Sequence, residues 1–392
     1  MKYTVGFNWD DELLSQINYP DVVSVYAGEG NAVIGSGRAP LVIQSVDDEQ
    51  IKRSISRAHK LGMKFEFTLN SGCLSNKEYT KDGHKNIIEY LEKLEALGAD
   101  SITVTLPSII NIAQKYTPNL KIKISTFQKI ASVEMAKRFD NMGVDAIMLA
   151  ENCNRDFRLL ETIKRAVHCK VILIANVGCI YNCPNSHSHI VTTSHSCDYD
   201  RKQTIFTIIP HSAECMLRKL SNPIEMVKSP YIRPEDVRYY EDLGIDMLKI
   251  CDRHTRTDVM TRRVKAYINQ KYEGNLLDLV GQKSERKSDE INQKELQKLL
   301  SQGKETANKT MEYFKYFDFS ISDLINIDNQ KYPSDFVEWF KKMDCTRTNC
   351  DNCGYCKKIA ERVMSVDKKK VDEVVKGLST LKNKIYNGSI LC

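Results

Sequence analysis

The chain has 392 residues, of which 42% are hydrophobic and 28% charged, and its 57 basic and 51 acidic side chains leave a formal net charge of +6. These proportions are typical of a soluble globular protein and argue against a fully disordered chain, a collagen-like repeat or a membrane bundle. At roughly 150 residues per domain, the length predicts two or three domains. The small positive excess does not indicate a dedicated nucleic-acid-binding protein.

Short β-rich runs alternate with amphipathic stretches through the first 270 residues. The runs predict eight strands, at residues 4–7, 22–26, 64–69, 101–106, 121–126, 146–150, 171–175 and 247–250. Apolar spacings of three and four predict helices at 47–61, 85–97, 107–116, 132–142, 156–167, 234–243 and 255–272. This alternation favours an α/β fold, a parallel (β/α)8 TIM-like barrel over 1–275. An open doubly wound sheet is the alternative, but no glycine-rich dinucleotide fingerprint follows the first strand.

Three features interrupt or follow this rhythm. The connection between the seventh and eighth strands is long enough to be an insertion, at 176–233, and in a barrel it would lie on the catalytic C-terminal face. Residues 276–310 are rich in Lys, Glu, Gln and Ser and are interpreted as a charged linker or surface helix. Residues 311–392, which contain an aromatic run and four clustered cysteines, predict a small, mainly helical C-terminal domain.

The clustered cysteines of this C-terminal region are Cys345, Cys350, Cys353 and Cys356, which we call the tail cysteines. Their short gaps allow successive thiolates to reach one centre, which is typical of an iron–sulfur cluster. Zinc is the alternative, although zinc ribbons usually take two pairs of cysteines from separate turns. We therefore expect a [4Fe–4S] cluster here, with zinc as the second possibility.

A second set of thiols, the loop cysteines, lies in the insertion and consists of Cys179, Cys183, Cys197 and Cys215. Cys179 directly follows the seventh strand, so these thiolates are candidates to enclose a [4Fe–4S] cluster at the barrel mouth. His187, His189 and His195 intervene, either as acid–base groups near the cluster or as solvated loop histidines. Of these, we select His187 as a catalytic candidate.

Polar residues follow the ends of several predicted strands, where TIM barrels carry binding and catalytic groups. The catalytic candidates among them are Glu151, Asn176 and Arg253. The substrate-binding candidates are Arg38, Gln128 and again Arg253, because a guanidinium can hold a carboxylate or phosphate with two hydrogen bonds. Each arginine has the alternative of a structural ion pair.

Several segments of the chain resemble the collagenase-like family peptidase U-32. The segment 232–236, then Tyr240, then 244–253 is similar to the block that closes that family's barrel. Residues 125–128, residues 35–38, and Glu151 with 154–156 are similar to further family motifs. The chain departs from the family pattern at Asp252, where a glycine is usual, and in the additional tail cysteines.

The resemblance implies oxygen-independent hydroxylation of RNA bases or quinone precursors, because better-understood members carry that activity and a [4Fe–4S] cluster held by four cysteines. Some of these members use prephenate as the oxygen donor. Carried over in order, the four cluster ligands are the loop cysteines.

We expect a cytoplasmic iron–sulfur enzyme that modifies a small molecule, a peptide or an RNA base. Its expected partner is an electron-donor protein, and no membrane partner is expected. A peptidase with structural metal and a non-catalytic RNA- or peptide-binding module remain the alternatives.

Overall fold

The computed structural model describes residues 1–392 except 31, 39–42, 197–208, 281–311, 314 and 390–392. Its central element is a closed barrel of eight strands in sequence order, and each strand is parallel to its neighbours. The strands are β1 (Lys2–Gly6), β2 (Val22–Ala27), β3 (Lys64–Leu69), β4 (Ser101–Val104), β5 (Lys121–Ile124), β6 (Ala146–Met148), β7 (Lys170–Ile174) and β8 (Met247–Ile250). The predicted barrel and all eight strands are therefore confirmed, with shifts of one or two residues at most ends.

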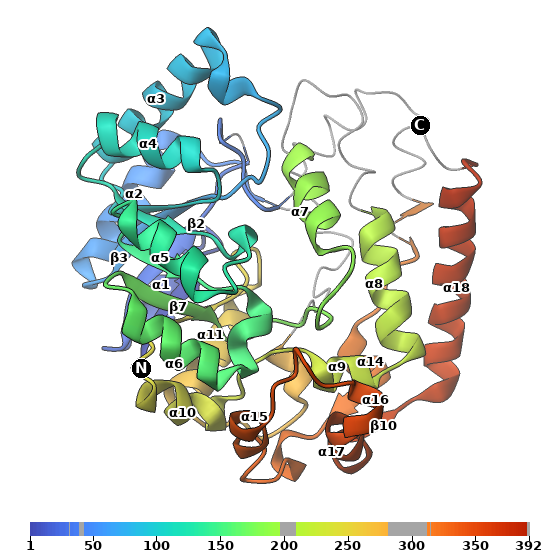
Figure 1. Ribbon diagram of the computed structural model, residues 1–392. Coiled ribbons are helices and arrows are strands. Elements are labelled where there is room, and N and C mark those ends of the chain that lie inside the picture. The colour runs from blue at the N-terminus through green and yellow to red at the C-terminus, as the bar shows by residue number, and fades with distance from the viewer. Residues whose placement is uncertain (31, 39–42, 197–208, 281–311, 314, 390–392) are drawn as a thin grey trace.

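Helices surround this barrel (Figure 1). The predicted ones are α2 (Asp48–Lys60), α3 (Lys81–Ala96), α4 (Pro107–Tyr116), α5 (Val133–Asn141), α6 (Phe157–Ala166), α10 (Val237–Asp242) and α11 (Thr257–Ile268). Several of these helices have an N-cap residue whose side chain accepts a hydrogen bond from a backbone amide of the first turn. Examples are Asp47 before α2 and Ser132 before α5. Gly98, at a φ of +97°, ends α3 in the left-handed conformation that glycine adopts at little cost.

Within the described part of residues 1–280, four helices were not predicted from the sequence. They are α1 (Asp11–Gln16), between β1 and β2, and α7 (Ser186–His195), α8 (Ile209–Ser221) and α9 (Ile224–Lys228), all in the insertion. The weak apolar periodicity of α7, in which Ser, Thr and His predominate, explains why no helical pattern was visible there.

The C-terminal region is mainly helical and packs on the barrel and its insertion. It contains α14 (Ile321–Leu324), α15 (Glu338–Lys342), α16 (Cys350–Cys353), α17 (Tyr355–Val363) and α18 (Lys368–Tyr386), with a small antiparallel sheet of β9 (Ile325–Ile327) and β10 (Met364–Val366). Figure 1 shows α18 running alongside α8. Ile327, Phe336 and Ile359 belong to the same hydrophobic cluster as the outer face of the barrel. The predicted boundary between 1–275 and 311–392 therefore separates regions that share one core, and the predicted linker at 276–310 lies almost entirely outside the described residues.

Alternation along the strands determines what fills the barrel interior. In β3, β5 and β8, apolar residues that join the outer core alternate with the charged residues Glu66, Lys123 and Lys249, which therefore face inward. A separate apolar cluster near β6 to β8, which includes Met148 and Ile172, fills another part of the interior. The barrel thus contains a buried charged layer beside a small apolar one.

Candidate active site

The mouth of the barrel lies where the strands end, and the polar residues predicted to surround it do follow the strands. Asn70 directly follows β3, Glu151 lies three residues after the end of β6, and Asn176 and Asp252 each lie two residues after the ends of β7 and β8. Because the carboxyl ends of parallel barrel strands meet on one face, these side chains collect at one end of the molecule. This is the end at which the β7–β8 insertion also begins.

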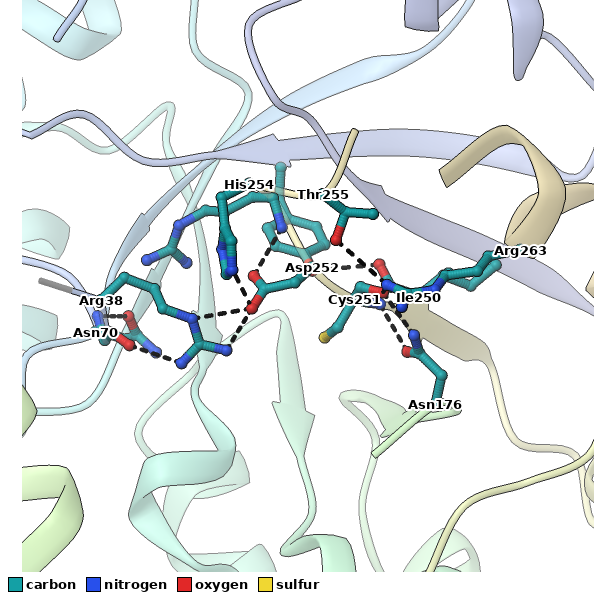
Figure 2. A network of polar contacts seen from close by, with 12 residues as sticks. Arg38, Asn70, Asn176, Ile250, Cys251, Asp252, His254, Thr255 and Arg263 are labelled. Carbon is teal, nitrogen blue, oxygen red and sulfur yellow. Dashed lines mark hydrogen bonds and ion pairs between the residues drawn. The ribbon is translucent and has the colours of Figure 1, made fainter. Parts of the chain in front are cut away.

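Asp252 is the centre of a polar network at this mouth (Figure 2). Nε and Nη2 of Arg38 both donate to Oδ2 of Asp252, with the Nε contact at 2.9 Å, and His254 Nδ1 lies 3.4 Å from the same oxygen. Burial by itself would raise the pKa of Asp252, but the charges of Arg38, His254 and Arg253 outweigh it and hold this pKa well below its usual range. Arg38, predicted to bind substrate, therefore makes an internal ion pair in the ligand-free protein.

Asn176 holds the end of β8 in place. Its Nδ2 donates to the carbonyl oxygens of Cys251 (2.5 Å) and Leu279 (3.1 Å), and its Oδ1 accepts from the Cys251 amide at 2.7 Å. Nη1 of Arg263 donates to the same Cys251 carbonyl at 3.0 Å. With its amide group engaged in this way, Asn176 positions the mouth of the barrel, whereas the sequence had suggested a catalytic part.

Arg253 crosses the top of the barrel where two glycines leave room. A Cβ atom on Gly28 would lie 3.0 Å from Nε of Arg253, and one on Gly6 would lie 2.7 Å from the carbonyl carbon of Asp252. The Arg253 side chain is only 8% exposed, so its cationic head is held among protein atoms at the mouth. Glycine at these two positions thus allows the β8 end to close over β1 and β2.

Glu151 is paired across the mouth with a residue that sequence reasoning did not select. Nζ of Lys129 forms a short ion pair with Oε1 of Glu151, and Oγ1 of Thr126 donates to Oε2 at 3.1 Å. Gln128, predicted to bind substrate, donates from Nε2 to the backbone carbonyl of Thr105. Lys129 immediately follows Gln128 in the chain, and its φ of +52° marks the sharp turn after β5.

Helix α7 of the insertion contacts the loop after β3. Oγ of Ser194 accepts from the amide of Gly72 at 2.7 Å, which attaches α7 to the rim. His189 on α7 stacks on His211 of α8 with ring centroids 5.5 Å apart. Burial and the positive charges of His211, Arg38 and Lys129 lower the pKa of His189 to about 4. The charges of Arg38 and Lys129 thus act on His189, whereas His187 is exposed to solvent.

The loop cysteines lie in this insertion, and three of the four are described. Cys179 follows β7 and is solvent-accessible, Cys183 is partly buried, Cys215 lies on α8, and Cys197 falls outside the described residues. Although Cys179 is accessible, the surrounding protein atoms and the charge of Glu151 raise its pKa to about 12, with Cys215 as a further contributor. Cys179, Cys215 and Glu151 are thus electrostatic neighbours.

The tail cysteines are all described and stand on a turn–helix–turn. Cys350 and Cys353 are the ends of α16, Gly354 turns the chain, and Cys356 is the second residue of α17. Over the described part of the chain, no three His, Cys, Asp or Glu side chains converge closely enough to hold a metal ion in this ligand-free arrangement. Both cysteine sets therefore remain predicted ligands.

A charged layer lies inside the barrel beneath the mouth. Nζ of Lys123 is 2.5 Å from Oε2 of Glu66, Oγ1 of Thr103 donates to Oε1 of Glu66, and Nζ of Lys249 lies 3.6 Å from the ring centroid of Tyr26. Burial would raise the pKa of Glu66, but Lys123 and Lys249 lower it overall. Burial lowers the pKa of Lys249. In the sequence, the only signal for this buried layer is a charged residue between apolar neighbours in each of three strands.

Comparison with known proteins identifies the barrel. Residues 20–184 match the model of Peptidase family U32. This part of the chain is similar to that family. The predicted U32 resemblance is thereby confirmed. A relative from Methanocaldococcus jannaschii, Uncharacterized protease MJ1657, is 26% identical over 334 residues, which cover 85% of this chain and 86% of the relative.

Two further matches are partial or distant. The tRNA hydroxylation protein P of Helicobacter pylori is 28% identical over 116 residues, which cover 30% of this chain and 25% of that protein. The solved structure of the U32 peptidase Mk0906 is 15% identical, with a TM-score of 0.48, and the alignment covers 64% of this chain and 92% of that one. Among the described helices, none has the length and apolar character needed to cross a bilayer.

Proposed function

We propose that this U32 protein catalyses an oxygen-independent, hydroxylation-type modification of an RNA base at the barrel mouth. The observation that carries the proposal is the position of Cys179, which follows β7 and shares its electrostatic surroundings with Glu151 and Cys215. The partial match to a tRNA hydroxylation protein supports the reaction type and RNA as the substrate. Hydroxylation of a base is a two-electron oxidation, so the reaction would use an oxygen donor that is itself reduced, or water together with an electron acceptor.

The loop cysteines suit an iron–sulfur cluster by the chemistry of their donors. Cys179, Cys183 and Cys215 supply sulfur from one connection, and Cys179 and Cys215 are close enough for each charge to affect the other. Iron–sulfur clusters are held by such thiolates. A cluster bound here would supply a redox or Lewis-acid centre at the substrate, with Cys197 as the fourth ligand.

The protein's own residues would bind and orient the substrate. Arg253 and Arg38 place cationic heads at the mouth, where a phosphate or another anionic group of an RNA substrate is attracted. Glu151, which receives hydrogen bonds from Lys129 and Thr126, presents a carboxylate that can accept a proton from the substrate. The stacked pair His189 and His211 adds an aromatic surface beside these charges.

The test compares RNA from cells with and without the protein. We expect one nucleoside to gain an oxygen atom in mass only when the wild-type protein is present, and to lack it with Cys183→Ser. Cys73→Ser is the matched control, because Cys73 is also partly buried but lies in the loop after β3. If nucleoside masses are the same with and without the protein, RNA is not the substrate.

The same preparations test the two alternative functions. Iron and acid-labile sulfide are measured after purification without oxygen, and Cys183→Ser is expected to lose iron while Cys73→Ser keeps it. Peptide cleavage that survives Cys183→Ser would instead indicate a peptidase. RNA binding without any change in the nucleoside masses would indicate a binding module.

A further inference from the structure

The tail cysteines stand against the barrel at a buried arginine. Helix α17, which carries Cys356, packs on α9 of the insertion. The C-terminal carbonyl groups of α9 accept hydrogen bonds from Nη1 of Arg155, at 2.9 Å for Val227 and 3.3 Å for Lys228. Arg155 comes from the turn after β6, so barrel, insertion and tail meet at this residue.

Arg155 is buried with part of its donor capacity unused. Its side chain lies within 5.3 Å of the ring centroids of Tyr231, Phe336 and Phe340, and the residue is only 7% exposed. Among the described residues, Nη2 of Arg155 has no hydrogen-bond partner, and no carboxylate is paired with this guanidinium. A buried cation without a counter-charge is costly, which indicates that an anion belongs beside it.

The tail cysteines approach this cation through a set of packed rings. Phe336 and Phe340, which lie beside Arg155, both pack on Tyr355, with ring centroids 6.1 and 5.7 Å from it. Tyr355 directly precedes Cys356 on α17, so Cys356 is one residue away from the rings that enclose the guanidinium.

We propose that the tail cysteines hold an iron–sulfur cluster whose negative charge is balanced by Arg155 and Lys228 of the barrel and insertion. The run Cys350-x2-Cys353-x2-Cys356 has the spacing of the bacterial ferredoxin motif, which favours a [4Fe–4S] cluster over zinc. The four sulfur atoms do not converge in the ligand-free structure, so insertion of the cluster would draw them together. Arg155 is then a positioning residue for the cluster, and this site is independent of the loop cysteines.

A role of this cluster in passing electrons to the mouth would rest on the function proposed above, whereas the presence of the cluster does not.

Metal content tests the site directly. The full-length protein is purified without oxygen, and iron, sulfide and zinc are measured for wild type, Cys353→Ser and the control Cys73→Ser. We expect Cys353→Ser to lose about four irons per chain, the content of one [4Fe–4S] cluster, while Cys183→Ser loses a separate set. Loss of zinc with iron unchanged, or no metal loss at all, would overturn the proposal.

The proposed balance between the cluster charge and Arg155 can be measured separately, through the reduction potential of the cluster. Reduction adds negative charge to a cluster, so a nearby cation raises the potential. We expect Arg155→Met to move one of the cluster signals, followed by EPR during a redox titration, to a more negative potential, and Arg155→Lys to move it less. The control is Arg158→Met, an exposed arginine on the neighbouring helix α6.

A milder variant covers the case in which Arg155→Met does not fold, because Arg155 also packs on three aromatic rings. Lys228→Gln keeps that packing and removes the second cation, which also pairs with Glu225 at 3.0 Å, so it should shift the same signal in the same direction but by less. The signal shifted must be the one that Cys353→Ser removes. If the potential of that signal is unchanged in Arg155→Lys and Lys228→Gln, the charge balance is refuted even when the cluster is present.

Discussion

The buried charged layer in the barrel gives the sharpest stability prediction. Glu66→Gln preserves the size of the side chain but removes the charge that faces Lys123 and Lys249. The Glu66 side chain is 1% exposed and that of Lys123 13%, so solvent does little to screen the pair. Removing one partner of a buried pair costs about 3–5 kcal/mol. We expect a cost within this range, because Glu66→Gln leaves Lys123 and Lys249 without their buried carboxylate.

The assay is urea denaturation followed by far-UV circular dichroism, with Lys123→Met and the double variant completing a cycle. The double variant should be more stable than the sum of the single effects predicts, because it leaves no unpaired carboxylate. Glu134→Gln on α5 is the control: its ion pair with Arg138 is exposed, so it should cost at most about 1 kcal/mol.

The pH dependence follows from the direction of the Glu66 shift. The pKa of Glu66 is lower in the folded protein than in the unfolded chain. Its contribution to stability is therefore complete above the unfolded value, about 4.3, and is lost as the pH falls through the folded value. The difference between wild type and Glu66→Gln should be large at neutral pH and shrink in acid. A cost as small as that of Glu134→Gln, or a cost independent of pH, would refute the reasoning.

Three further predictions concern the mouth of the barrel. Gly6→Ala should lower the melting temperature and weaken catalysis, because the new Cβ would meet the carbonyl carbon of Asp252 at 2.7 Å; a melting curve like that of wild type would contradict this. Asn176→Ala should cost about 1–3 kcal/mol in unfolding free energy, since the Cys251 amide loses its buried partner, and should reduce activity through misplacement of the β8 end; unchanged stability in urea would speak against a positioning role. Arg253→Lys should keep the fold and the iron content but lose most activity through a higher KM, because lysine cannot reproduce the two-bond contact of a guanidinium; turnover at the wild-type rate and KM would exclude the clamp.

Local patterns in the sequence were sufficient to predict the barrel and to predict that its polar residues lie at the carboxyl ends of the strands. The eight strands and most of the helices follow from periodicity and from terminating glycines such as Gly98, which depend only on neighbours in the chain. Once the strands are parallel, their carboxyl ends must share one face, so Glu151, Asn176 and Arg253 could be placed there without coordinates. The short helix α7 escaped because its polar composition carries no apolar stripe.

Only the tertiary structure decided which of these residues meet. Arg38 pairs with Asp252, 214 positions away, and Arg155 contacts both the insertion and the tail. No local pattern encodes such pairings, because they depend on how the barrel closes and how α17 packs on α9. The sequence by itself therefore determined the barrel and its candidate ligands. Folding determined that Asn176 supports β8, that Glu151 is bound by Lys129, and that a buried cation stands beside the tail cysteines. The reason is that charge compensation acts through space and not along the chain.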